Sequence, residues 1–207
     1  NEVYDLLVEF ENYIVGEVII PITHTLAGLP GTQLSELKRV YSKAEALMQT
    51  TRFLEEHSDW QQISVANTAI AAKKILDDQD RTQAAVCSAY AAKVYGLEVL
   101  DDNINDESGN CTRFIIVTNQ KVFLKGAKKI SICFEVPHES GSLYHLLSHF
   151  IYNDLNMTKI ASRPIKGRPW EYCFFVDFEG NLEDPAVKNA IRGLREEATN
   201  LKILGNY

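Results

Sequence analysis

The chain has few residues that break regular structure and lacks the common cofactor motifs. It holds 11 Gly and 6 Pro in 207 residues, and no stretch is rich enough in them to act as a linker. A P-loop, a G-x-S-x-G nucleophile elbow and a dinucleotide fingerprint are all missing. With 45% hydrophobic residues, we expect an ordered protein with a packed core and no cofactor.

Cysteine motifs and long apolar runs are also missing. Cys87, Cys111, Cys133 and Cys173 are widely spaced and form no C-x-x-C pair, so neither a zinc site nor a disulfide framework is indicated. We expect no metal. Free thiols without a secretory leader indicate the cytoplasm. No apolar run approaches the roughly 18 residues that a membrane span needs, so no membrane partner is expected.

Basic residues are fewer than acidic ones. The chain has 21 Lys and Arg against 28 Asp and Glu, a net charge of -7, and no basic block. Nucleic acid and anionic membranes are poor partners for such a chain, which leaves small molecules or proteins.

Short apolar runs alternate with helical patterns from residue 14 to residue 118, which predicts an α/β fold. Three strands run directly into helices that begin with capping residues: a capping box at Ser42, then Asn67 and Ser88. The Ser42 helix should carry Leu47, Thr50, Phe53 and Leu54 along one side. In a parallel sheet these helix N-termini share the carboxyl edge, where a small anion can bind; ordinary capping is the alternative.

Residues 128–207 have a different pattern, in the order β-α-β-β-α-β. Both helices are amphipathic and should pack on one face of a four-stranded antiparallel sheet. Their apolar positions are Leu143, Leu146, Leu147, Phe150 and Ile151 in the first, and Val187, Ile191, Leu194, Ala198 and Leu201 in the second.

Polar residues from Asn110 to Phe114 stand at the entrance of an apolar strand, where they either face a crevice or form a turn. The triplet Thr112-Arg113-Phe114 resembles the T-R-F signature of prephenate dehydratases. Further along, GSLY at 141–144 is similar to the family's G-A-L-V/Y turn, and ASRP at 161–164 to its E-S-R-P motif. The resemblance covers essentially the whole chain.

The resemblance implies a two-domain architecture. Residues 1–122 would form a catalytic domain of the bilobal, periplasmic-binding-protein-like α/β type, and residues 127–207 a ferredoxin-like βαββαβ ACT domain. The family's Gly-rich G-P-x-G-T segment and its P-I-E-N stretch are missing, so we expect the N-terminal part of the catalytic domain to be absent. Ala161 stands where the family has Glu, which weakens the expectation of feedback control.

The implied activity is conversion of prephenate to phenylpyruvate in L-phenylalanine synthesis, without a cofactor. Thr112, Arg113 and Phe114 would be catalytic, with Thr112 donating a hydrogen bond to the leaving hydroxyl. Arg113 would pair either with a substrate carboxylate or with a carboxylate of the protein, and Phe114 would pack beneath Thr112. Asn110, Ser88 and Asn67 would bind substrate.

The resemblance also implies regulation by L-phenylalanine in a dimer or tetramer. The effector would bind at Gly141, Ser142, Leu143, Tyr144, Ser162, Arg163 and Pro164. The alternative is a non-catalytic amino-acid-binding protein built from an incomplete dehydratase domain and an ACT domain.

Overall fold

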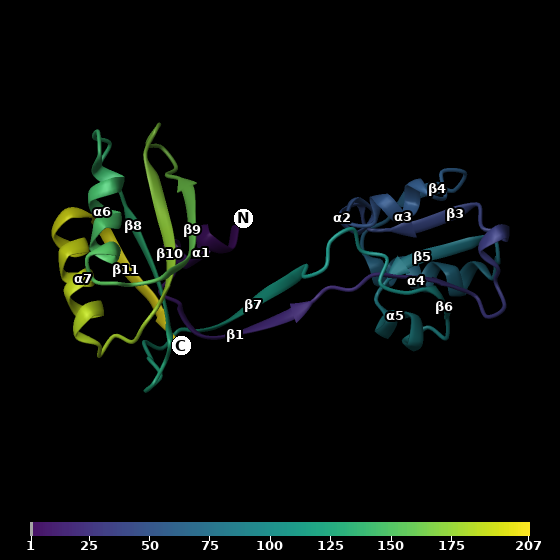
Figure 1. The fold of residues 1–207 in the computed structure, drawn as a ribbon, viewed down its shortest axis with the longest axis horizontal. Helices are drawn as coiled ribbons and strands as arrows, with labels where there is room; N and C mark the ends of the chain where they lie inside the picture. Colours follow the sequence, from purple (N-terminus) through teal and green to yellow (C-terminus); the bar gives the residue numbers. More distant parts are fainter. Residues whose placement is uncertain (1) are drawn as a thin grey trace. The chain divides into compact units, whose positions relative to one another are not determined.

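The computed structural model describes residues 2–207, which form two compact units (Figure 1). The first contains residues 2–18 and Arg113–Tyr207, and the second contains Ile19–Thr112. The chain passes between them within strands β1 (Tyr13–Pro21) and β7 (Cys111–Thr118). This division by packing differs from the expected domains 1–122 and 127–207. The reason is that β1 and β7 are strands of the C-terminal sheet and that the helix before β1 packs on this sheet.

The second unit is a five-stranded mixed sheet in the order β4-β3-β5-β2-β6, which agrees with the predicted α/β class. Strand β3 runs parallel to β4 and β5, whereas β2 runs antiparallel to β5 and β6. The strands are β2 (Thr25–Gly28), β3 (Arg39–Ser42), β4 (Gln61–Ser64), β5 (Gln83–Cys87) and β6 (Glu98–Asp101). The helices are η1 (Leu34–Glu36), α2 (Ala44–Met48), α3 (Thr51–Glu55), α4 (Thr68–Asp78) and α5 (Ala89–Val94).

The core of this unit lies on both faces of β5, which is buried along its whole length. Alternate side chains of a strand point to opposite faces. Ala85 and Cys87 therefore join the cluster formed with α4 and α5, and Ala84 and Val86 join the cluster formed with α2 and α3. Small residues on a central strand let helices approach the sheet closely on both sides.

Two of the three predicted helix caps are present. The side chain of Asn67 accepts a hydrogen bond from the backbone N–H of Ile70 at 2.8 Å, and that of Ser88 accepts one from Ala91 at 3.1 Å. Each cap satisfies one backbone donor that has no partner within its helix.

The predicted capping box at Ser42 is wrong. Ser42 is the buried last residue of β3, and its hydroxyl donates to the carbonyl of Val86 at 2.6 Å instead of capping a helix. Lys43 holds the N-cap position of α2 without a side-chain cap. The single expected helix is also two short ones, α2 and α3, with the N-cap of α3 at Thr50, whose hydroxyl donates to Ala46.

The first unit contains a six-stranded sheet in the order β7-β1-β11-β8-β10-β9. Its further strands are β8 (Lys129–Glu135), β9 (Met157–Pro164), β10 (Tyr172–Glu179) and β11 (Thr199–Asn206), and its helices are α1 (Glu2–Glu9), α6 (Ser142–Ile151) and α7 (Pro185–Glu197). The predicted order β-α-β-β-α-β is confirmed from β8 to β11. The sheet has two more strands than expected because β1 pairs in parallel with β11, with Ile14 opposite Gly205, and β7 lies beside β1.

Helices α6 and α7 pack on one face of the inner strands, as predicted. Leu146 and Phe150 of α6 and Val187, Ile191 and Leu194 of α7 are buried. The first apolar stripe is narrower than expected, since Ile151 is 65% exposed. In the second, Leu201 lies in β11 and not in the helix.

Helix α1 packs on the opposite face of the same sheet. Leu7 of α1 joins Ile14, Cys133, Cys173 and Phe175 in a second cluster on that face. Within residues 2–207, no helix has the length and apolar character that crossing a membrane requires.

Candidate functional site

The T-R-F triplet occupies the start of β7. Thr112 is the last residue of the second unit and is half-buried, and Arg113 is the next residue and belongs to the first unit. Because side chains alternate along a strand, Thr112 and Phe114 point to one side and Arg113 to the other. Phe114 is 52% exposed and belongs to none of the core clusters of the described residues, and its packing beneath Thr112 stays a prediction.

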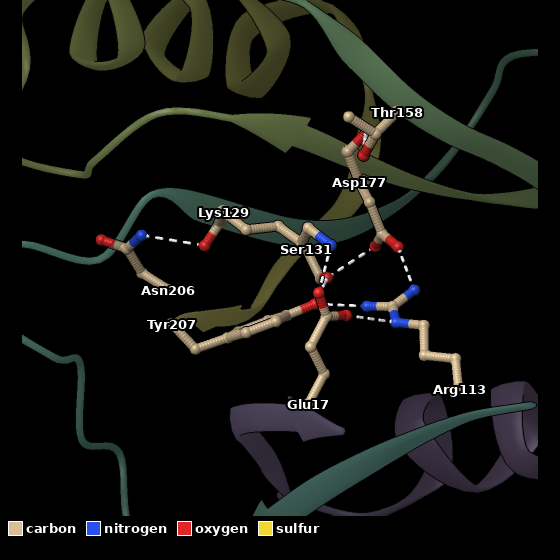
Figure 2. Close-up of polar contacts among 8 residues, drawn as sticks. All are labelled: Glu17, Arg113, Lys129, Ser131, Thr158, Asp177, Asn206 and Tyr207. Atoms are coloured by element: carbon tan, nitrogen blue, oxygen red, sulfur yellow. Dashed lines mark hydrogen bonds and ion pairs between the residues drawn. The ribbon is translucent and has the colours of Figure 1, made fainter. Parts of the chain in front are cut away.

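Arg113 is the centre of a polar network in the first unit (Figure 2). Its Nε donates to Oε2 of Glu17 on β1, its Nη1 to Oδ2 of Asp177 on β10, and its Nη2 to the hydroxyl of Tyr207, each at 2.5 Å. Three acceptors from three parts of the chain therefore hold one planar guanidinium.

The acceptors are themselves held by further partners. Ser131 on β8 lies directly opposite Asp177 and donates to its Oδ1 at 2.5 Å, and the hydroxyls of Ser131 and Tyr207 lie 2.9 Å apart. Lys129 forms an ion pair with the other oxygen of Glu17. Since Ser131 donates to Asp177, Tyr207 donates to Ser131, and the chain of hydrogen bonds is complete.

The positive and negative charges of the network balance, and its side chains are largely shielded from water. Its two cations and two carboxylates have side chains between 11% and 27% exposed. Burial alone would lower the pKa of Arg113, but the hydrogen bond and charge of Asp177 outweigh it and raise that pKa. Burial likewise opposes the charge of Glu17, yet Lys129 and Arg113 hold its pKa below the usual range. Burial raises the pKa of Tyr207, which keeps its proton.

Of the two roles expected for Arg113, the structure shows the pairing with carboxylates of the protein. Its partners are 96, 64 and 94 positions away in sequence, so sequence reasoning missed Glu17, Asp177 and Tyr207. No local pattern marks them.

A cavity of about 560 Å³ lies in the second unit, beside the residues that lead into Thr112. It is lined by Met48, Gln49, Asn105, Asp106, Glu107, Ser108, Gly109, Asn110 and Cys111. Asn110 is one of the lining residues, and its binding of substrate stays a prediction. The polar side chains are three amides, one hydroxyl and the carboxylates of Asp106 and Glu107, and this lining contains no Lys or Arg.

The loop that forms the cavity wall is fixed by two side chains. Asn105 accepts a hydrogen bond from the backbone N–H of His24 at 2.7 Å. The carboxylate of Asp106 accepts from the backbone N–H groups of Thr51 and Arg52, both at 2.9 Å, at the start of α3. Sequence reasoning missed both residues, because their partners are more than 50 positions away.

Asn67 and Ser88 lie at the predicted edge of the sheet. Strands β3, β4 and β5 are parallel and end there, and α4 and α5 begin just beyond. Both side chains are engaged in capping, and neither lines the cavity of Asn110.

The two expected effector segments lie at the same end of the first unit's sheet. Strands β8 and β9 are both antiparallel to β10, so both end at the edge where α6 begins. Gly141 is the N-cap of α6 with a φ of 84°, which favours glycine, and the hydroxyl of Ser142 donates to the carbonyl of Pro137 at 2.6 Å. Leu143 is half-buried, whereas Tyr144 is 66% exposed.

Arg163 is occupied by the protein. Its Nε and Nη2 donate to the carboxylate of Asp5 in α1 at 3.0 and 2.6 Å. Arg163 and Pro164 line a cavity of about 220 Å³ that contains neither Ser162 nor residues 141–144. The structure thus brings the two segments to one end of the sheet but not into one cavity.

The fold and site define a class of protein. A polar cavity at the carboxyl edge of an α/β sheet is a usual binding place for small molecules, and a ferredoxin-like βαββαβ unit follows it. A family profile described as prephenate dehydratase matches residues 1–122, and the chain belongs to this family.

Similar proteins and solved structures support membership of this family. The chain is 39% identical to a bifunctional chorismate mutase/prephenate dehydratase of Aquifex aeolicus, over 100% of the chain and 57% of the relative. It is 35% identical to arogenate dehydratase/prephenate dehydratase 6, chloroplastic, of Arabidopsis thaliana, over 99% and 54%. A prephenate dehydratase of Arthrobacter aurescens, solved in complex with L-Phe, superposes with a TM-score of 0.87 at 30% identity, over 99% and 69%. The chain spans about half the length of these curated relatives.

Proposed function

We propose that this chain is part of a prephenate dehydratase that converts prephenate to phenylpyruvate, carbon dioxide and water. The observation that carries the proposal is the position of Thr112, which directly follows Cys111, the last residue of the polar segment that lines the cavity of about 560 Å³, in a chain of this family.

The reaction needs little chemistry from the protein. The bond between the ring and its carboxylate breaks, its electron pair moves into the ring, and the hydroxyl at the opposite carbon leaves as water once it gains a proton. Aromatisation drives the step, so the site mainly has to hold the substrate and stabilise the leaving oxygen. The Thr112 hydroxyl is too weak an acid for full proton transfer near neutral pH, and we assign it as the hydrogen-bond donor to that oxygen.

Substrate recognition is proposed for the polar edge of the second unit. Asn110 supplies an amide in the cavity wall, and the N-termini at Asn67 and Ser88 supply backbone N–H groups for a carboxylate. Phe114 contributes through its exposed ring, next to Thr112 in the same strand. Arg113 acts by position, because protein carboxylates already hold it.

The test is turnover by the purified chain. Formation of phenylpyruvate from prephenate is followed for the wild type and for Thr112→Val, which keeps the shape of the side chain and removes its hydroxyl. We expect kcat to fall at least 100-fold, since one lost transition-state hydrogen bond costs roughly 2.7–4 kcal/mol. L-arogenate is assayed in parallel, because a relative's name includes that substrate.

The control for this variant is Thr118→Val, at the other end of the same strand. It should leave kcat within twofold. Full activity of Thr112→Val, with unchanged far-ultraviolet circular dichroism, would remove Thr112 from the mechanism.

We further propose that residues 127–207 are an ACT domain that binds L-phenylalanine between two copies of the chain. The βαββαβ order supports this, as does the shared sheet end of residues 141–144 and 162–164. A homo-oligomer and, from four free thiols, the cytoplasm are part of the proposal. Calorimetric titration with L-phenylalanine should give saturable heat that L-leucine and L-tyrosine do not, and Gly141→Ala should abolish it. Equal heats for all three would contradict an effector site.

A second candidate is a non-catalytic amino-acid-binding protein. The observation that favours it is the engagement of Arg113 by Glu17 and Asp177, together with a cavity lining that contains no Lys or Arg to hold a dicarboxylate. Saturable L-phenylalanine binding with no turnover of either substrate would support this candidate over the enzyme.

A further inference from the structure

We propose that Glu17 and Asp177 are positioning residues for Thr112, and that they act on it through Arg113. This inference rests on the proposed role of Thr112. In addition, it gives residues of the C-terminal sheet a part in positioning the Thr112 side chain.

The first step is that Arg113 reaches strands that are not its neighbours. In the order β7-β1-β11-β8-β10-β9, three strands separate β7 from β10. With neighbouring strands about 4.8 Å apart, a flat sheet would place β7 roughly 19 Å from β10, far beyond the reach of an arginine. The 2.5 Å contact between Arg113 and Asp177 therefore requires the Arg113 side chain to lie over the face of the inner strands.

The second step is that this placement is defined by charge. Both oxygens of Asp177 are used, one by Arg113 and one by Ser131, and both oxygens of Glu17 are used, one by Arg113 and one by Lys129. A guanidinium held by acceptors on separate strands has a single orientation (Figure 2). Moving it would leave partly buried charges without partners, which is strongly unfavourable.

The third step is covalent. Thr112 and Arg113 share a peptide bond, so their Cα atoms are separated by about 3.8 Å, and the anchored residue limits the positions open to its neighbour. Thr112 itself makes no side-chain hydrogen bond among the described residues. The Arg113 network is thus a rigid support one residue away from the proposed catalytic hydroxyl, in addition to the pairing of β7 with β1.

A purely structural role is the competing explanation. The inner sheet, however, has its own apolar core: Ile130, Val176 and Phe178, which neighbour Ser131 and Asp177 in sequence, are fully buried against α6 and α7. That core holds β8 and β10 together without the network. Ile14 of β1 and Ile115 of β7 also pack against the inner strands, in the cluster on the α1 face. What the network adds is a fixed orientation of the Arg113 side chain at the start of β7.

The test uses Glu17→Gln and Asp177→Asn, which keep size and an acceptor oxygen but remove the charge. The matched controls are Glu11→Gln, an exposed carboxylate just before β1, and Glu179→Gln, an exposed carboxylate two residues after Asp177 on the same strand. Glu17→Gln serves as the second variant if Asp177→Asn does not fold.

Two measurements are made. The first is the amide hydrogen exchange of Thr112 and Arg113, followed by NMR; we expect at least tenfold faster exchange in both variants and no change in the controls. The second is kinetics with prephenate, where kcat should fall at least tenfold while KM stays within twofold, and Asp177→Glu should recover part of kcat. Because a smaller folded fraction would by itself also lower the apparent kcat at unchanged KM, kcat is calculated per folded molecule, with the folded fraction measured by circular dichroism.

The outcomes separate the two proposals. Unchanged exchange at Thr112 in folded variants, or unchanged kcat, overturns the positioning role. If the wild type does not turn over prephenate, the proposed function fails, and the exchange of the Thr112 amide still decides the inference.

Discussion

At the scale of single residues, the charge of Glu17 links stability to pH. Its folded pKa lies below the usual value of 4.5, so its contribution to stability is present above pH 4.5 and is lost as the pH falls through the lowered folded pKa. We expect Glu17→Gln to lower stability at neutral pH and to flatten the loss of stability between about pH 5 and pH 3. Urea unfolding at several pH values measures this, with Glu11→Gln as control; parallel acid limbs for Glu17→Gln and wild type would contradict it.

Residues whose partners are local could be predicted, and residues whose partners are distant could not. Asn67 and Ser88 are caps because each bonds a backbone N–H three positions ahead, a pattern that the sequence carries. Ser42 has the same residue type before a helix, but its hydroxyl meets Val86 on the neighbouring strand. Only the folded sheet decides between a helix cap and a bond across the sheet.

At the scale of elements, the pairing of β1 with β11 depends on Gly205. A Cβ atom there would lie 2.2 Å from the carbonyl oxygen of Ile14, a backbone atom that cannot turn aside. We expect Gly205→Ala to separate the two strands and to destabilise the first unit by about 1–3 kcal/mol, the usual cost of overpacking. Thermal unfolding measures this. Gly16→Ala, whose Cβ would meet only Ile116 at 3.5 Å, is the control and should change stability little.

Strand β1 also shows which property of an element the sequence does not predict, namely the strand with which it pairs. The order β-α-β-β-α-β could be predicted because each element carries its own periodicity. The addition of β1 and β7 could not, since their apolar residues fit several partners equally well. Strand register is specified only where one face is buried, and Val18, Ile19 and Ile20 of β1 remain exposed.

At the scale of the whole molecule, each unit has its own core. Ile75 belongs to a cluster of the second unit and Phe178 to a cluster of the first. We expect two separate unfolding transitions, one for each unit. Ile75→Ala should lower the free energy of unfolding of the second unit, and Phe178→Ala that of the first, each by about 2–5 kcal/mol. Calorimetry of the two variants checks this. If both mutations shifted one common transition equally, the units would unfold as one.

The four thiols give the molecule a further property. Cys87, Cys133 and Cys173 are buried, whereas Cys111 is exposed, lines the polar cavity and directly precedes Thr112. Maleimides and other thiol reagents attack accessible sulfur first. A single fluorophore or spin label can therefore be attached at the cavity wall, on the residue before Thr112, without engineering the sequence, and its signal would report the entry of a ligand into that cavity.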